Sequence, residues 1–211
     1  MTPYFITIAG NIGVGKSTLV ALLTTRLGWA PVFEAVQENP YLADFYQDMQ
    51  RWSFQSQVFF LSRRLQQHHA LLETRQPTIQ DRSVYEDAEI FARNLQRQGH
   101  MSARDWAVYY ELYQTMARLL RPPHLVVYLR ASVATLQRRI AQRGRDYERG
   151  ISAEYLSQLN ALYDSWVADF NLSPVLTIET DSLDYVQYDE HLDRIWAKIE
   201  ERLAGKDILT L

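Results

Sequence analysis

Apolar residues along this chain occur in short continuous runs, which alternate with longer stretches where apolar residues recur every three or four positions. The short runs are rich in β-branched and aromatic residues and predict buried strands. The longer stretches predict helices, because that spacing places apolar side chains on one face. Five runs predict strands, at residues 4–9, 31–33, 78–81, 124–129 and 174–179.

Helical patterns fill the intervals between these runs. Gly28, Pro77 and Gly99 are expected to end helices, and Ser102, Ser132 and Ser152 are expected to cap the N-termini of others. The predicted helices cover about residues 17–27, 41–49, 52–75, 85–98, 102–120, 132–142, 152–170 and 190–203. This alternation predicts an α/β fold with a five-stranded parallel sheet, helices on both faces and right-handed crossovers. Groups that carry chemistry are then expected at the carboxyl ends of the strands.

The turn after the first strand has a specific pattern. Residues 10–17 read Gly-Asn-Ile-Gly-Val-Gly-Lys-Ser, which matches the P-loop pattern G-x-x-x-x-G-K-[ST]. Glycines let backbone N–H groups surround phosphate oxygens, and the following helix N-terminus adds partial positive charge. Lys16 would reach the β- and γ-phosphates, and the Ser17 hydroxyl would bind Mg²⁺. The motif predicts a nucleoside triphosphate site.

Composition excludes several other classes of protein. The chain has 211 residues, a net charge of −3 and a pI near 6.0, so we expect one domain over 1–211 and no nucleic-acid polymer as partner. It contains no cysteine, and its five histidines form no metal-binding pattern. Neither a signal-peptide pattern nor a long apolar stretch is present, which predicts a cytoplasmic protein without a membrane partner.

Polar residues at two other strand ends suggest what accepts the phosphoryl group. Glu34 closes the second predicted strand, where a carboxylate can take the proton of an acceptor hydroxyl. Asp81 and Arg82 close the third. There the carboxylate can hold Mg²⁺ or its water, and the arginine can steady acceptor and phosphate.

Three arginines form a further group. Arg139 and Arg143 are four positions apart and share a helical face, and Arg145 follows Gly144. Guanidinium groups over a triphosphate would neutralise the charge that spreads during transfer and would exclude water. We therefore expect an Arg-rich lid over about residues 143–150.

Together these motifs resemble the deoxycytidine, deoxyguanosine and deoxyadenosine kinase family over about residues 6–188. The P-loop has the family form. Residues 34–36 resemble its Glu-Pro-Val with alanine in place of proline, and residues 52–57 resemble its Trp-x-Phe-x-x-Gln segment. Residues 81–87 resemble its (Asp/Glu)-Arg-Ser motif, with aspartate where the animal members have glutamate. Residues 139–151 resemble its lid, and residues 184–185 its donor-adenine loop.

The resemblance implies a P-loop nucleoside-kinase fold and ATP-dependent phosphorylation of a deoxynucleoside 5′-hydroxyl with Mg²⁺. It also implies a homodimer that pairs through helices 52–75 and 102–120. The implied ATP-binding residues are Gly10, Asn11, Ile12, Gly13, Val14, Gly15, Lys16, Ser17, Thr18, Asp184 and Tyr185, and the implied metal ligands are Ser17 and Asp81. The implied catalytic residues are Glu34 as base, Arg82, Lys16, Arg139, Arg143 and Arg145. Substrate contacts are implied for Glu34 and Arg82 at the 5′-hydroxyl, Tyr46 and Glu148 at the 3′-hydroxyl, and Gln57, Arg64, Asp87 and Phe91 at the base.

The base contacts favour nucleobases with an amino group, because Gln57 and Asp87 can accept its hydrogens. Asn39 stands where the cytidine-type enzymes carry an aromatic residue, which favours a two-ring base. We therefore expect deoxyadenosine first, deoxyguanosine second, deoxycytidine third and thymidine last. Two alternatives remain open: a thymidylate-like monophosphate kinase, which would need extra basic residues for the acceptor phosphate, and a nucleotide-binding module without catalysis.

Overall fold

The computed structural model describes residues 3–33, 38–145, 148 and 150–204. Its strands are β1 Phe5–Gly10, β2 Ala30–Val32, β3 Thr78–Asp81, β4 Leu125–Arg130 and β5 Val175–Glu179. Its helices are α1 Lys16–Leu27, α2 Leu42–Gln47, α3 Met49–Glu73, α4 Val84–Glu86, η2 Asp87–Ala92, α5 Arg93–Arg97, α6 Ala103–Ala117, α7 Val133–Arg143, α8 Ala153–Asp169 and α9 Asp189–Ala204. Each predicted strand and helix is present with ends shifted by a few residues, and the helix predicted at 85–98 contains the π-helical segment η2.

All five strands are parallel and lie in the order β2-β3-β1-β4-β5. The central strand β1 pairs with β3, where Ile8 lies opposite Asp81, and with β4, where Gly10 lies opposite Leu129. The P-loop and the turn that follows Asp81 therefore leave the sheet at the same edge. This register brings the two motifs together, as a parallel sheet predicts.

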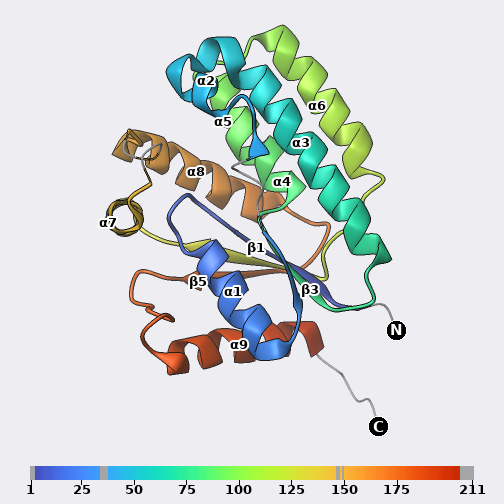
Figure 1. The fold of residues 1–211 in the computed structure, drawn as a ribbon, viewed down its shortest axis with the longest axis vertical. Coiled ribbons are helices and arrows are strands. Elements are labelled where there is room, and N and C mark those ends of the chain that lie inside the picture. The colour runs from blue at the N-terminus through green and yellow to red at the C-terminus, as the bar shows by residue number, and fades with distance from the viewer. Residues whose placement is uncertain (1–2, 34–37, 146–147, 149, 205–211) are drawn as a thin grey trace.

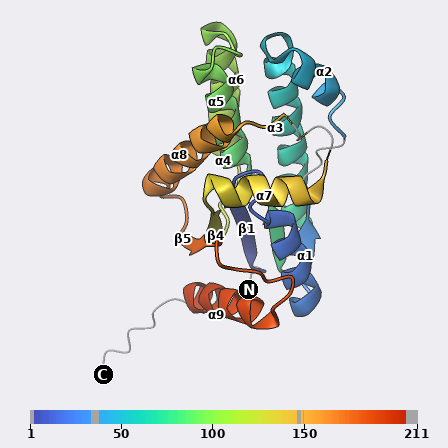
Figure 2. The same cartoon turned by 90° about the vertical axis from the view of Figure 1, so that its left-hand side faces the viewer.

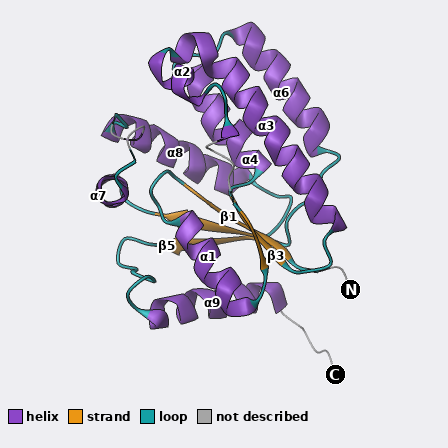
Figure 3. Ribbon diagram, in the orientation of Figure 1, coloured by secondary structure: helices purple, strands orange, loops and turns teal. Residues whose placement is uncertain are grey.

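Helices cover both faces of the sheet, which Figure 3 shows as one thin layer between them. In Figures 1 and 2, α1 and α9 lie on one side, and α3, α4, α6 and α8 lie on the other. Strand β4 contributes to both layers: Leu125 and Val127 pack in the first apolar core, and Val126 and Tyr128 pack in the second. Buried on both faces, such a strand is a continuous apolar run rather than an alternating one.

Capping residues mark the starts and ends of several helices where the sequence predicts them. The hydroxyls of Ser102, Ser132 and Ser152 accept hydrogen bonds from the backbone N–H groups three residues later, which confirms the three predicted N-caps. Gly28 ends α1 in a left-handed conformation. Among the described helices, none combines the length and apolar character needed to cross a membrane.

His68 is a buried imidazole on α3. Its Nε2 accepts a hydrogen bond from the backbone N–H of Arg121 at 3.1 Å, and its ring lies edge-on to Phe5. Burial lowers the pKa of His68 below its ordinary value of 6.5, and the charge of Arg121 lowers it further. The neutral imidazole is thus the form that fits the fold.

We predict that the free energy of unfolding decreases as pH falls through about 6.5, because the unfolded state then binds the His68 proton more tightly than the folded state does. His68→Gln should reduce this pH dependence, as followed by urea unfolding between pH 8 and pH 5. The control is His69→Gln, since that neighbouring side chain is exposed. Equal pH slopes in wild type and His68→Gln would contradict the prediction.

Candidate active site

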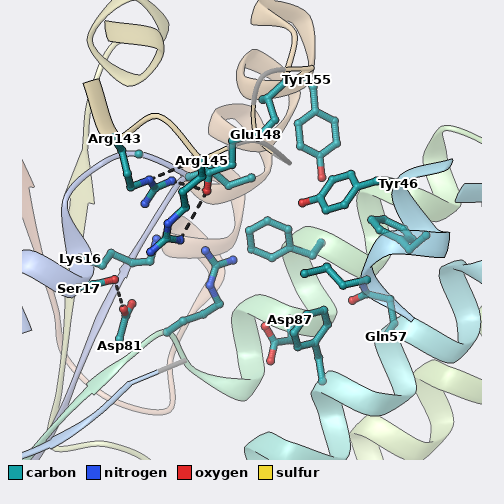
Figure 4. A pocket seen from close by; sticks show the side chains of 18 of the residues that line it. Lys16, Ser17, Tyr46, Gln57, Asp81, Asp87, Arg143, Arg145, Glu148 and Tyr155 are labelled. Atoms are coloured by element: carbon teal, nitrogen blue, oxygen red, sulfur yellow. Dashed lines mark hydrogen bonds and ion pairs between the residues drawn. The ribbon is translucent and has the colours of Figure 1, made fainter. Parts of the chain in front are cut away.

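An inner cavity of about 490 Å³ opens at the carboxyl edge of the sheet. P-loop residues, the turn after β3, helices α2, α3 and α8, and the end of α7 contribute to its walls (Figure 4). The sequence-predicted residues that line it are Ile12, Gly13, Lys16, Ser17, Tyr46, Gln57, Asp81, Arg82, Asp87, Phe91, Arg143, Arg145 and Glu148. The fold therefore gathers residues from most of the chain at one site.

An outer groove of about 570 Å³ lies on the other side of the P-loop, between α7 and residues 181–187. The predicted donor-site residues Gly15, Thr18, Asp184 and Tyr185 line it. Gly13 and Arg143 line both the groove and the inner cavity. A ligand in the inner cavity and a ligand in the outer groove would therefore meet beside the P-loop.

The P-loop glycines allow close backbone approach. Gly10 has a φ of 144°, and a Cβ there would lie 2.5 Å from the carbonyl oxygen of Leu129. Gly13 has a φ of 81°, and its Cβ would lie 2.6 Å from Cγ1 of Ile140. Lys16 Nζ donates to the carbonyl oxygens of Gly10 at 2.8 Å and Asn11 at 3.0 Å. Only glycine therefore fits at positions 10 and 13 without displacement of neighbouring atoms.

Asn11 fixes the loop from the side of α8. Its Nδ2 donates to the carbonyl oxygen of Leu156 at 2.9 Å and to Oδ1 of Asn160 at 2.8 Å, and its Oδ1 accepts from the Ile12 N–H at 2.7 Å. Val14 is fully buried in the core around α1. The side chains of Asn11 and Val14 therefore shape the loop, while the backbone is left to contact phosphate.

Ser17 and Asp81 form the candidate metal site. Ser17 Oγ donates to Asp81 Oδ2 at 2.5 Å. Asp81 Oδ1 is buried and has no hydrogen-bond partner among the described residues. A carboxylate oxygen and a hydroxyl side by side are the ligand types that Mg²⁺ prefers. The residues present thus fit the ion that the sequence predicts.

Arg82 has an unusual backbone conformation. Its φ of 65° is the only positive value at a non-glycine residue among those described, and such a residue costs about 1–3 kcal/mol. Its backbone N–H donates to the carbonyl oxygen of Ile8 at 3.0 Å, and its guanidinium lies 4.1 Å above the centre of the Phe91 ring. The strained turn aims this cation into the cavity, and one face of Phe91 is covered by it.

The far end of the cavity contains a buried ion pair. Arg64 Nε donates to Asp87 Oδ2 at 2.9 Å, and Arg64 NH1 donates to the carbonyl oxygen of Asp81 at 3.1 Å. Asp87 lines the cavity, and Arg64 holds it from behind. Gln57 Oε1 is buried without a hydrogen-bond partner in the described part of the chain. This end of the cavity is therefore lined by the acceptor-bearing side chains of Asp87 and Gln57.

The predicted lid divides into two parts. Glu148 Oε2 and Oε1 accept from Arg143 at 3.0 and 2.6 Å, and Arg145 lies 3.7 Å from Glu148 Oε1 (Figure 4). Arg139 lies apart from this ion pair, although it lines the outer groove together with Arg143. It lies one helical turn earlier and donates to the carbonyl oxygens of Val14, Thr180 and Leu183. Residues 146–147 and 149 of the predicted lid lie outside the described residues.

The loop after β5 borders the outer groove. Tyr185 Oη donates to the carbonyl oxygen of Gly15 at 3.1 Å, and burial raises the pKa of Tyr185 to about 12. Asp184 Oδ1 accepts from the backbone N–H groups of Val186 and Gln187. Tyr185 therefore joins the P-loop to this wall of the groove, and Asp184 stabilises the turn itself.

Two sequence predictions need comment. Glu34, the predicted base, lies outside the described residues. Asn39 is not among the described residues that line the inner cavity, and the expectation that it leaves room for a two-ring base stays a prediction. Its Nδ2 donates to Ser56 Oγ at 3.0 Å and its Oδ1 accepts from the Tyr41 N–H at 2.9 Å. Asn39 instead holds the start of α2, a role typical of asparagine before a helix.

Sequence reasoning missed several residues at the site. Phe33, Phe45, Phe60 and Tyr155 line the cavity, and the hydroxyls of Tyr155 and Tyr46 point toward one another in Figure 4. Burial raises the pKa of Tyr155 to about 12, so its hydroxyl stays protonated. In the sequence these aromatic residues have helical or strand spacing, which is equally typical of core residues. No local sequence feature distinguishes an aromatic residue that lines the site from one in the core.

Comparison with known proteins agrees with this geometry. The sequence pattern of the family described as deoxynucleoside kinase matches residues 6–204. The deoxyadenosine/deoxycytidine kinase of Bacillus subtilis is 38% identical over 192 residues, with 90% of this chain and 88% of that protein covered. The deoxyguanosine kinase of the same organism is 36% identical, with 96% and 99% covered. The structure of deoxyadenosine kinase from M. mycoides with bound dATP has a TM-score of 0.80 at 30% identity, with 94% of this chain and all of that chain covered.

We predict that the Arg64–Asp87 pair is costly to break and less costly to remove. Asp87→Asn removes the carboxylate that pairs with the buried Arg64 guanidinium and should lower the free energy of unfolding by about 3–5 kcal/mol. The double variant Arg64→Met/Asp87→Ala should lose less in urea unfolding at pH 7. The control Glu201→Gln breaks an exposed ion pair and should change stability by less than about 1 kcal/mol. A double variant at least as unstable as Asp87→Asn would refute the prediction.

Proposed function

The chain belongs to the deoxynucleoside kinase family, and from this premise we propose that it transfers the γ-phosphoryl group of ATP to the 5′-hydroxyl of a purine deoxyribonucleoside. The observation that carries the proposal is the junction of the two cavities, since Gly13 and Arg143 line both. ATP in the outer groove would extend its phosphates over the P-loop toward an acceptor in the inner cavity. In-line transfer needs the reacting groups to meet in this way.

Donor-side roles follow from the contacts at the junction. Lys16, which bonds to carbonyl oxygens of its own loop, would move to the β- and γ-phosphates. Ser17 and Asp81 would hold Mg²⁺, whose charge offsets that of the phosphates when it is bound. Arg143 and Arg145 would stabilise the negative charge that spreads over the transferring phosphoryl group. Arg139 would hold the groove in shape through its carbonyl contacts.

Acceptor-side roles fit the opposite end of the inner cavity. The base would lie beside Phe91 and Gln57, and the sugar beside Tyr46 and Glu148, all of which line this cavity. Glu34 is proposed as the base that takes the 5′-hydroxyl proton, with Arg82 beside it. This end has Arg64 as its deep cation, and Asp87 neutralises it. The arrangement suits a neutral nucleoside better than the phosphate of a monophosphate acceptor.

Base preference is proposed in the order deoxyadenosine, deoxyguanosine, deoxycytidine and thymidine. Gln57 Oε1 lacks a partner among the described residues and can accept a hydrogen of an exocyclic amino group. Adenine, guanine and cytosine carry such a group, and thymine does not. Relatives named for deoxyadenosine/deoxycytidine, deoxyadenosine and deoxyguanosine are 38%, 37% and 36% identical to this chain, so each of these names includes a purine deoxynucleoside.

We also propose that the protein forms a homodimer through α3 and α6. Val108 and Leu112 on α6 are 54% and 38% exposed, which is high for apolar side chains on neighbouring helical turns. Pairing with a second copy would cover them.

The function is tested by incubation with ATP, Mg²⁺ and a panel of deoxynucleosides, ribonucleosides and monophosphates, with products separated by chromatography. We expect 5′-monophosphates from the deoxynucleosides. Lys16→Ala should lower turnover about 10²- to 10³-fold, because it removes a charge at the transferring group. Lys198→Ala on α9, whose side chain is exposed, is the control. Preferred phosphorylation of monophosphates, or normal turnover by Lys16→Ala, would contradict the proposal.

Base preference is tested by competition among the four deoxynucleosides at equal concentration. The wild type should follow the proposed order. In Arg64→Met/Asp87→Ala, thymidine should gain relative to deoxyadenosine, because the carboxylate that needs an amino donor is gone. If thymidine is already the best substrate of the wild type, the proposed roles of Arg64 and Asp87 are wrong.

A further inference from the structure

The Glu86 carboxylate is completely buried between the P-loop and the turn after β3. Its Oε1 accepts from the backbone N–H of Gly10 at 3.1 Å and from Tyr163 Oη at 2.8 Å. Its Oε2 accepts from the backbone N–H of Ser83 at 2.8 Å and from Ser83 Oγ at 3.2 Å. One side chain therefore joins β1, the turn after β3, and α8.

A local structural role explains only half of this arrangement. Ser83 and Glu86 form a capping box at the start of α4, which requires Oε2 alone. The contacts of Oε1 reach residues 76 and 77 positions away in the chain, Gly10 and Tyr163. A buried carboxylate is costly unless hydrogen bonds satisfy both oxygens. The second oxygen thus has a separate function that the cap does not need.

On the P-loop side, Glu86 acts together with Tyr163. The single hydroxyl hydrogen of Tyr163 lies between Glu86 Oε1 and the carbonyl oxygen of Gly10, each 2.8 Å from Oη. Burial, and then the charge of Glu86, hold the pKa of Tyr163 well above 10, so the phenol remains a donor. The same Gly10 carbonyl accepts from Lys16 Nζ at 2.8 Å. Glu86 and Tyr163 together fix the peptide groups from which Lys16 is aimed.

On the acceptor side, Glu86 restrains the strained turn. Arg82 has its φ of 65° directly before Ser83. The Ile8 carbonyl holds the N–H of Arg82, and Glu86 holds the N–H of the next residue. A left-handed arginine persists only where surrounding contacts impose it. These two hydrogen bonds therefore determine where the Arg82 guanidinium enters the cavity.

We propose that Glu86, oriented by Tyr163, is a positioning residue for phosphoryl transfer, because it sets the P-loop and the Arg82 turn at a fixed distance. Neither Glu86 nor Tyr163 lines the described cavities. They act through Lys16 and Arg82, which must meet the transferring group together. The inference rests on the proposed function of these two cations.

The test compares Glu86→Gln and Tyr163→Phe with wild type in deoxynucleoside kinase assays. Glu86→Gln places an amide NH₂ against two donors and should lower kcat about 10- to 100-fold, the loss typical of a small misplacement. It should also raise the KM for ATP, with the KM for the deoxynucleoside within about threefold, because the base contacts are untouched. Tyr163→Phe should lower kcat about 3- to 10-fold. Combined, their effects should be less than multiplicative, since they share one hydrogen bond.

Two matched controls remove a carboxylate and a phenol hydroxyl from neighbouring residues. Glu89→Gln removes a carboxylate that binds Arg93 and Tyr110, outside the cavities. Tyr128→Phe removes a phenol that binds Asp164, on a ring stacked 5.5 Å from that of Tyr163. Both should lower thermal stability and leave kcat and both KM values unchanged. The folded fraction of every variant is measured by circular dichroism at the assay temperature.

The possible outcomes distinguish a failure of this inference from a failure of the proposed function. The proposal is overturned if folded Glu86→Gln and Tyr163→Phe keep the wild-type kcat, or if the controls lose as much kcat at the same loss of melting temperature. If Glu86→Gln does not fold, the kcat and the two KM values of Tyr163→Phe decide. A wild type that phosphorylates no deoxynucleoside would instead refute the proposed function, and the inference would fail with it.

Discussion

The close approach of backbone segments at the start of the P-loop is the constraint on which the rest of the site depends. At Gly10 the chain leaves β1 so near the Leu129 carbonyl of β4 that no Cβ fits. Because β1 is central and also pairs with β3, the same register places Asp81 beside Ile8. The distance between the phosphate loop and the acceptor-side groups is thus set by the sheet, and helices supply much of the remaining wall of the inner cavity.

Two of the buried carboxylates at the site are each paired with an arginine. Arg64 is paired with Asp87 at the far end of the inner cavity, and Glu148 binds Arg143 near its mouth. Isolated charges there would be too costly in a low-dielectric interior. Under the proposed function, the far end would receive the uncharged base, and Lys16, Arg143 and Arg145 would meet phosphate where the two cavities join.

Much of the fold could be predicted from the sequence, because the determining signals are local. The strand at 78–81 has the predicted ends, and the N-cap at Ser132 is confirmed. Side-chain partners could not be predicted, because they are far apart in sequence. Asn39 bonds to the Ser56 hydroxyl, and Arg139, which lines the outer groove, bonds to the Val14 carbonyl; neither partner could be read from the sequence. Glu86 falls within the motif at residues 81–87, and only the tertiary structure reveals its bond to Gly10.

Glu148 connects the two halves of the site in a further way. Its two oxygens bind Arg143 and Arg145, and Arg143 also borders the outer groove. A sugar hydroxyl that donates to Glu148 would compete for lone pairs that these arginines use. Under the proposed function, the presence of an acceptor and the position of the arginine charges would therefore be linked through one carboxylate. Glu148 is only 5% exposed, which is consistent with such a shared role.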